Sequence, residues 1–100
     1  MILEIADIRV HPGREAEFAQ AIRHAIATVM PKVNGAHDFR VHQCIETPQR
    51  FVLQITWDTL EDHTAGFRQG PQFAEWRAII GPFFASPPHV EHFTLVSGAG

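Results

Sequence analysis

Several side chains of this 100-residue chain could act together on a flat aromatic molecule, and most of them fall between residues 50 and 84. Tryptophan and phenylalanine rings bind such molecules by stacking, and an arginine can pair with an anionic oxygen on them. The candidates for substrate binding are Trp57, Phe67, Phe73, Trp76 and Arg77. For Trp57 the competing interpretation is a ring that fills the core at the end of a strand, with its N–H bonded to the backbone.

Two histidines are candidates for a catalytic base. A neutral histidine can accept a proton from a phenol or an activated C–H group near pH 7. His63 follows Trp57 by six residues on a predicted helix, within reach of the same cavity, and His92 lies on the last predicted strand. The alternatives are a partly exposed helix histidine at His63 and a structural role at His92, which strand parity places on the face away from the helices.

The sequence does not predict a metal site. His89 and His92 are three residues apart on a strand and therefore point to opposite faces, as do His37 and His42. Cys44 shares a face with His42, but an arginine at position 40 lies between that pair and the nearest carboxylate. A cysteine in the middle of a strand is usually an inert small hydrophobe, so we expect no nucleophilic role for it.

Hydrophobic periodicity predicts the elements that must position these side chains. Alternating residues indicate strands, and apolar residues three and four apart indicate helices. Thr59 and Asp62 approximate a capping box, and Pro71 suits the first turn of a further helix. The predicted elements are a strand over 2–10, a helix over 14–29, a strand over 36–45, a strand from 51 to 57, a helical stretch from 59 to about 84 that is interrupted at Gly70-Pro71, and a strand over 89–96.

This order is β-α-β-β-α-β, which predicts an α+β, ferredoxin-like fold: a four-stranded antiparallel sheet with both helices on one face. The other face is too apolar to be solvated and too polar to be a core. We therefore expect a homodimer in which two sheets pack face to face into an α+β barrel. The predicted outer face holds Leu3, Ile5, Asp7, Arg9, Arg40, His42, Val52, Gln54, Thr56, Val90, His92, Thr94 and Val96.

Bulk composition predicts one domain over residues 1–100, with a core from about 2 to 96 and a flexible tail at 97–100. The net charge is −3 with only 8 lysines and arginines, so the chain lacks the excess of basic residues that is typical of a nucleic-acid binder. No apolar run is long enough for a membrane span, and Cys44 has no partner for a disulfide. We expect a cytoplasmic protein without membrane or nucleic-acid partners.

Nearly the whole chain resembles the antibiotic biosynthesis monooxygenase (ABM) domain family. The likeness rests on the element order, on the Val10-His11-Pro12-Gly13-Arg14 entry into the first helix, and on Trp57 followed by His63, Phe67, Phe73 and Trp76. The resemblance implies a dimeric α+β barrel with a pocket between sheet and helices in each subunit. Some members of that family oxidise quinols or anthrone-like aromatics with O₂ and no cofactor, and others bind and degrade haem.

The resemblance leads to three hypotheses. The first is a cofactor-independent monooxygenase acting on a quinol- or anthrone-like aromatic, and the second is a dimeric barrel that binds a small aromatic or hydrophobic molecule without turning it over. The third, haem binding or degradation, is disfavoured: the asparagine and histidine of the haem-degrading branch align with Ala6 and Arg77, and arginine offers iron no lone pair. We therefore expect no cofactor.

Overall fold

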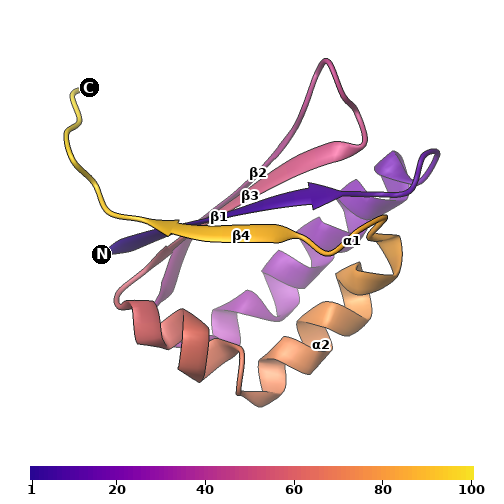
Figure 1. Ribbon diagram of the computed structural model, residues 1–100. Helices are drawn as coiled ribbons and strands as arrows, with labels where there is room; N and C mark the ends of the chain where they lie inside the picture. The colour runs from indigo at the N-terminus through magenta and orange to yellow at the C-terminus, as the bar shows by residue number, and fades with distance from the viewer.

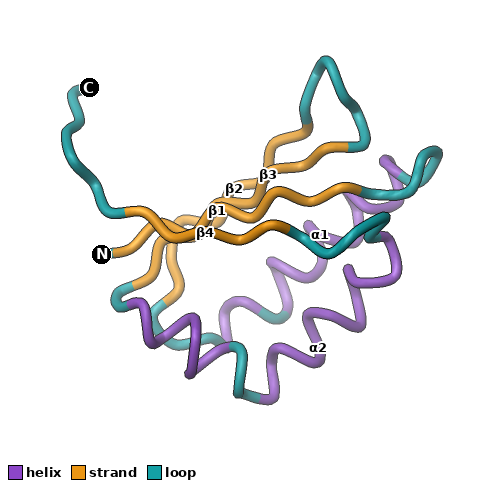
Figure 2. The backbone as a smooth tube through the Cα atoms, viewed as in Figure 1, coloured by secondary structure: helices purple, strands orange, loops and turns teal.

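The computed structural model describes all 100 residues and has the predicted order of elements (Figure 1). Its four strands form one antiparallel sheet in the order β2-β3-β1-β4, and the helices cover one face of that sheet (Figure 2). The elements are β1 (Ile2–Arg9), α1 (Glu15–Thr28), the short 3₁₀ turn η1 (Met30–Lys32), β2 (Ala36–Gln43), β3 (Arg50–Trp57), the π-helical turn η2 (Asp62–Phe67), α2 (Pro71–Ile80), the 3₁₀ turn η3 (Gly81–Phe83) and β4 (His89–Phe93). The predicted ferredoxin-like α+β fold is confirmed.

Local chemistry explains where the helical elements begin. The hydroxyl oxygen of Thr59 accepts a hydrogen bond from the backbone N–H of Asp62 at 3.1 Å, as the capping interpretation predicted. Pro71 occupies the first turn of α2, where its missing N–H costs nothing. The stretch between them is a π-helical turn that buries His63 and Phe67, whereas Leu60, just before it, is 40% exposed.

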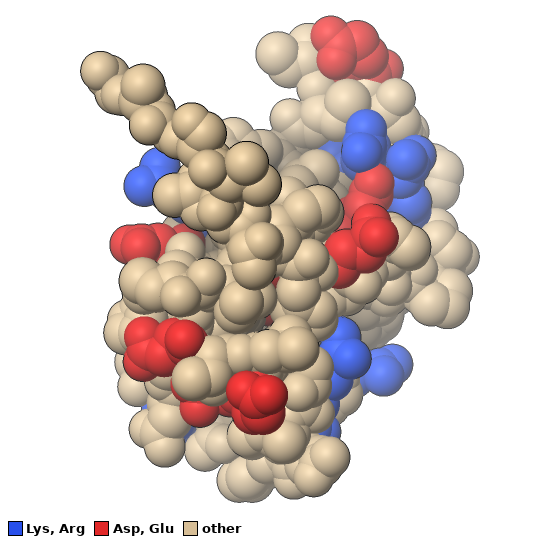
Figure 3. Space-filling view, turned by 60° about the vertical axis from the view of Figure 1, so that its left-hand side comes forward, with Lys and Arg blue, Asp and Glu red and all other residues tan.

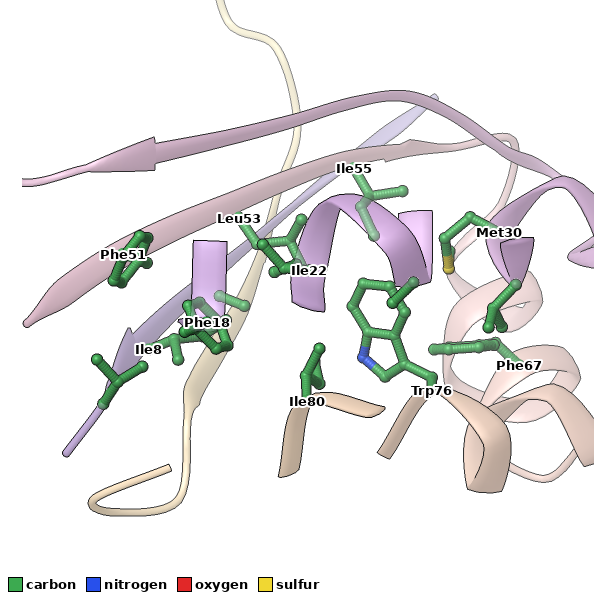
Figure 4. Packing of buried hydrophobic residues seen from close by; sticks show 14 of the residues in the cluster. Ile8, Phe18, Ile22, Met30, Phe51, Leu53, Ile55, Phe67, Trp76 and Ile80 are labelled. Carbon is green, nitrogen blue, oxygen red and sulfur yellow. The ribbon is translucent and has the colours of Figure 1, made fainter. Parts of the chain in front are cut away.

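The core lies between the sheet and the helices (Figure 4). Inward-facing residues of β1 and β3 meet a helical stripe on α1 that includes Phe18, Ile22 and Ala25. Phe18 packs edge-on against Phe51 of β3, with ring centroids 4.8 Å apart. Fifteen buried hydrophobic residues form one continuous cluster, and partly buried side chains of β2, η3 and β4 pack against it, among them Val41, Phe83 and Val90.

The structure corrects the predicted face of β4. Antiparallel pairing places Val90 opposite Ala6 and His92 opposite Glu4, so both side chains lie on the helix-facing side. β4 also ends at Phe93, which pairs with Leu3, because β1 offers almost no backbone beyond that point. Residues after Phe93 lead away from the sheet (Figure 1), and Val96 is 95% exposed.

A second correction concerns the strand predicted to reach residue 45. Pairing between β2 and β3 stops at Gln43 opposite Phe51, so Ile45 lies in the connecting loop and is 88% exposed. A register irregularity between His37 and Arg40, with Asp38 at φ 53°, leaves Phe39 and Val41 packed against the core.

The outer face of the sheet carries no helix (Figure 1). Leu3, Ile5 and Val52 lie there half-buried, and Phe93 is 43% exposed. Elsewhere the surface is mixed in charge: the face shown in Figure 3 has small, separate groups of acidic and basic side chains on a largely tan surface. None of the helices has the length and hydrophobicity that a bilayer crossing requires.

Candidate active site

A cavity of about 470 Å³ lies between the helix-facing side of the sheet and α2. Small side chains on the sheet, such as Ala6, leave room that the aromatic residues of η2 and α2 only partly fill. This volume falls within the roughly 300–1,000 Å³ of typical small-molecule sites. The lining consists of Glu4, Ala6, Ile8, Leu53, His63, Phe67, Arg68, Phe73, Trp76, Arg77, Ile80, Gly81, Val90 and the segment from 84 to 88.

The aromatic wall of the cavity is built around Phe67. Its ring meets Phe73 edge-on at a centroid distance of 5.4 Å and Trp76 at 6.3 Å. Arg77 lies over the Phe73 ring, with its guanidinium carbon 5.9 Å from the centroid. Four of the five residues predicted to bind substrate, all except Trp57, therefore line one cavity.

Trp57 does not line the cavity. Its ring is fully buried and stacks on His63 at a centroid distance of 4.8 Å and an interplanar angle of 20°. Its indole N–H donates a hydrogen bond to Oε1 of Glu4 at 2.9 Å. A ligand cannot stack on this ring as predicted, because protein atoms cover both the ring and its N–H. Trp57 instead positions Glu4 and His63.

His63 connects the cavity to a second histidine. It lines the cavity while only 3% exposed, and its Nδ1 lies 2.7 Å from Nε2 of His92. A contact this short between two ring nitrogens requires one of them to donate a proton to the other. Its other nitrogen, Nε2, lies 3.4 Å from Oε1 of Glu4. The two predicted base candidates are therefore one hydrogen-bonded pair, which the expected outward parity of His92 did not allow.

Glu4 is the site residue that the sequence analysis missed. It is a carboxylate at the inward-facing position of β1 between Ile2 and Ala6, and only 5% of its surface is exposed. A lone charged residue on the buried face of an apolar strand is the signal that could have identified it. Oε1 is held by Trp57, whereas Oε2 makes no hydrogen bond. Because no fully buried side-chain polar atom lacks a partner, Oε2 retains access to the cavity.

Burial and a nearby arginine set the protonation of this cluster. Burial, the charge of Arg68 and the charge of His92 together lower the pKa of His63 to about 3, so its imidazole is neutral at pH 7. Burial raises the pKa of the Glu4 carboxyl, although the Trp57 hydrogen bond and Arg68 oppose that rise. Burial and Arg68 also lower the pKa of His92. The cavity wall thus holds the neutral imidazole of His63, with His92 bonded behind it, beside a carboxyl that burial inclines toward its protonated form.

The side chains around the cavity do not form a metal centre. No group of three histidine, cysteine, aspartate or glutamate side chains is arranged to hold a metal ion. Nδ1 of His63 is occupied by its hydrogen bond to His92, whereas Nε2 lies 3.4 Å from Oε1 of Glu4 and has no hydrogen bond within the protein. The polar cluster is suited to holding and moving a proton beside an aromatic ligand.

The fold and site define an α+β domain with an aromatic-lined cavity between one sheet and its helices. A family model described as "Antibiotic biosynthesis monooxygenase" matches residues 1–79, and the chain belongs to this ABM family. The uncharacterized Bacillus subtilis protein YczJ is 37% identical over 93 residues, which are 93% of this chain and 97% of YczJ.

Solved structures agree with this assignment. A Bordetella bronchiseptica protein with the provisional name antibiotic biosynthesis monooxygenase is 43% identical, with a TM-score of 0.90 over 96% of this chain and 97% of that protein. SnoaB, a cofactor-independent oxygenase from Streptomyces nogalater, has a TM-score of 0.79 over 97% of this chain and 94% of its own. At 14% identity, the likeness to SnoaB is one of fold.

Proposed function

We propose that this protein is a cofactor-independent monooxygenase that oxidises a quinol- or anthrone-like aromatic with O₂. The observation that carries the proposal is the Glu4–His63–His92 cluster in and behind the wall of an aromatic-lined cavity. Membership of the ABM family supports it. The fold shared with SnoaB, itself a cofactor-independent oxygenase, is consistent with it.

The reaction needs a base and no external reductant. For an anthrone-like carbon, R₂CH₂ and O₂ give R₂C=O and water, so the substrate supplies all four electrons and both hydrogens of the water. Loss of a proton makes a carbanion that can transfer an electron to O₂, and the radical pair then forms a peroxide that loses water. The protein's part is to bind the ring, exclude bulk water and accept the first proton.

His63 and His92 form the proposed proton path. His63 borders the cavity, and His92 is only half-buried, so the pair joins the ligand side to the outer edge of β4. With a pKa lowered to about 3, His63 passes a proton on more readily than it retains one. In this proposal Trp57 and Glu4 keep the His63 ring oriented.

Oxygen uptake by metal-free protein against a panel of quinols, anthrones and flavonols tests this function. We expect uptake that survives chelation and falls by about 10²–10⁴-fold in His63→Gln, the range for losing a general base. His92→Gln should lower the rate, and His24→Gln, an exposed histidine on α1, should leave it unchanged. Uptake that equals substrate autoxidation, or that does not respond to His63→Gln, would reject the proposal.

One observation favours a second function, a binding protein for a small aromatic or hydrophobic molecule without turnover. Oε1 of Glu4 and Nδ1 of His63 are already hydrogen-bonded to other protein groups. Hydrogen bonds of this kind can serve purely to satisfy buried polar groups beneath an aromatic pocket. Ligand binding without oxygen uptake across the panel would support this alternative.

We also propose that the protein is a cytoplasmic homodimer formed by the outer face of the sheet. The half-buried Leu3, Ile5 and Val52 would lose their remaining exposure beneath a second sheet. Light scattering should give about twice the 11.2 kDa mass of one chain. Ile5→Lys should shift the mass toward one chain, whereas Ala27→Lys on the exposed side of α1 should not. A wild-type monomer at micromolar concentration would refute this interface.

A further inference from the structure

The charged groups that line the cavity are unequally buried. Two arginines, Arg68 and Arg77, line it, and the only acidic lining residue is Glu4. Glu4 and His63 are buried, whereas both arginines are exposed residues. The cavity therefore combines a buried carboxyl and a buried neutral imidazole with two solvent-exposed guanidinium groups.

Neither arginine has its charge balanced within the protein. The ion pairs of the structure involve other basic side chains, and no carboxylate lies within pairing distance of Arg68 or Arg77. Arg23 and Arg40 are also unpaired, but neither lines this cavity. The distinguishing feature of Arg68 and Arg77 is that both border one aromatic-walled space whose only carboxyl is buried.

We propose that the cavity takes an aromatic monoanion, with a carboxylate held by Arg68 and Arg77 at the mouth and the ring system against Phe67, Phe73 and Trp76. A guanidinium binds a carboxylate through two parallel, charge-assisted hydrogen bonds. Anchoring the anion on these exposed side chains leaves the uncharged part of the ring for the buried wall that Glu4 and His63 form. This inference rests on the proposed function for the reaction and adds the class and orientation of the ligand.

The buried side of the cavity, with Glu4 and His63, is compatible with this orientation. A carboxylate next to Glu4 would face another acid in a desolvated place, which disfavours two charges there. An uncharged ring edge or hydroxyl on that side can instead meet Oε2 of Glu4, which has no partner in the protein. The direction of the Glu4 pKa, raised by burial, agrees with a site that excludes a second negative charge.

A matched pair of ligands tests the inference. Calorimetric titration of the full-length protein with 2-naphthoate and with its uncharged isostere 2-naphthamide compares two ligands that share a ring system. Only naphthoate carries a carboxylate. We expect naphthoate to bind on the order of tenfold more tightly, as charge-assisted hydrogen bonds provide. Arg68→Gln and Arg77→Gln should each weaken naphthoate severalfold and leave naphthamide binding unchanged.

Arg23→Gln is the control, because Arg23 is an exposed, unpaired arginine that lines a smaller cavity between α1 and β2. Equal affinity for both ligands would overturn the charge preference while leaving the aromatic cavity of the proposed function in place. A loss of naphthoate binding in Arg23→Gln alone would assign the anion to the smaller cavity and also overturn the inference. Failure of both ligands to bind would count against the inference and the proposed function together.

Discussion

Replacing Trp57 by alanine is expected to lower the free energy of unfolding by about 3–5 kcal/mol, the range for truncating a buried aromatic side chain. The Trp57 ring is fully buried and stacks on His63, and its N–H satisfies a buried carboxyl. Because domains of this size have roughly 5–15 kcal/mol of stability in total, the loss would be a large share of it. Urea denaturation followed by circular dichroism measures this change.

Phenylalanine substitutions separate the hydrogen bond from the packing. Trp57→Phe keeps much of the ring but removes the donor to Glu4, and an unsatisfied buried acceptor costs about 1–3 kcal/mol. Trp76→Phe is the matched control, since Trp76 is also buried but its indole N–H makes no hydrogen bond within the protein. If both variants lost the same stability, the Trp57–Glu4 bond would have no special energetic role.

The second large effect is the pH dependence of the protein's stability that His63 is expected to cause. The pKa of His63 is about 3 in the folded protein, below its ordinary value of 6.5. The unfolded chain therefore binds a proton at this residue between those two pH values, and the folded protein does not. Stability should fall as the pH is lowered from 6.5, by up to about 1.4 kcal/mol per pH unit from this residue alone.

Urea denaturation at pH 7, 6, 5 and 4 measures that slope. His63→Gln should remove this part of the acid sensitivity, so the gap in stability between the variant and the wild type should change steadily with pH. His24→Gln, at an exposed position on α1, provides the control with an unchanged slope. A gap between His63→Gln and the wild type that stays constant from pH 7 to pH 4 would contradict a neutral His63 in the folded protein.

Glu4 makes stability change with pH in the opposite direction to His63. Burial raises its pKa, so its contribution is present at low pH and is lost as the pH rises through the folded pKa. The contribution of His63 to the slope of stability against pH is therefore obtained by comparing the wild type with His63→Gln, because the wild-type curve alone contains both effects.

The sequence by itself determined the element order and the aromatic side of the site. Alternation in β1 and β3 and the apolar stripe of α1 are local patterns, and they predicted which residues of those elements face the core. Phe67, Phe73 and Trp76 follow from helical spacing on η2 and α2, and Arg77 was chosen for its charge; all four line the cavity. These predictions succeeded because side-chain direction within one element depends mainly on its period.

Only the tertiary structure decided which polar groups meet. β4 carries apolar residues on both faces, and the sequence analysis assigned His92 to the wrong one; pairing with β1 placed it beside Glu4 and within 2.7 Å of His63. Trp57 was predicted to face a ligand, but His63 and Glu4 cover it. Register between strands distant in sequence, and the burial that shifts the pKa of His63, are set by contacts that no local pattern encodes.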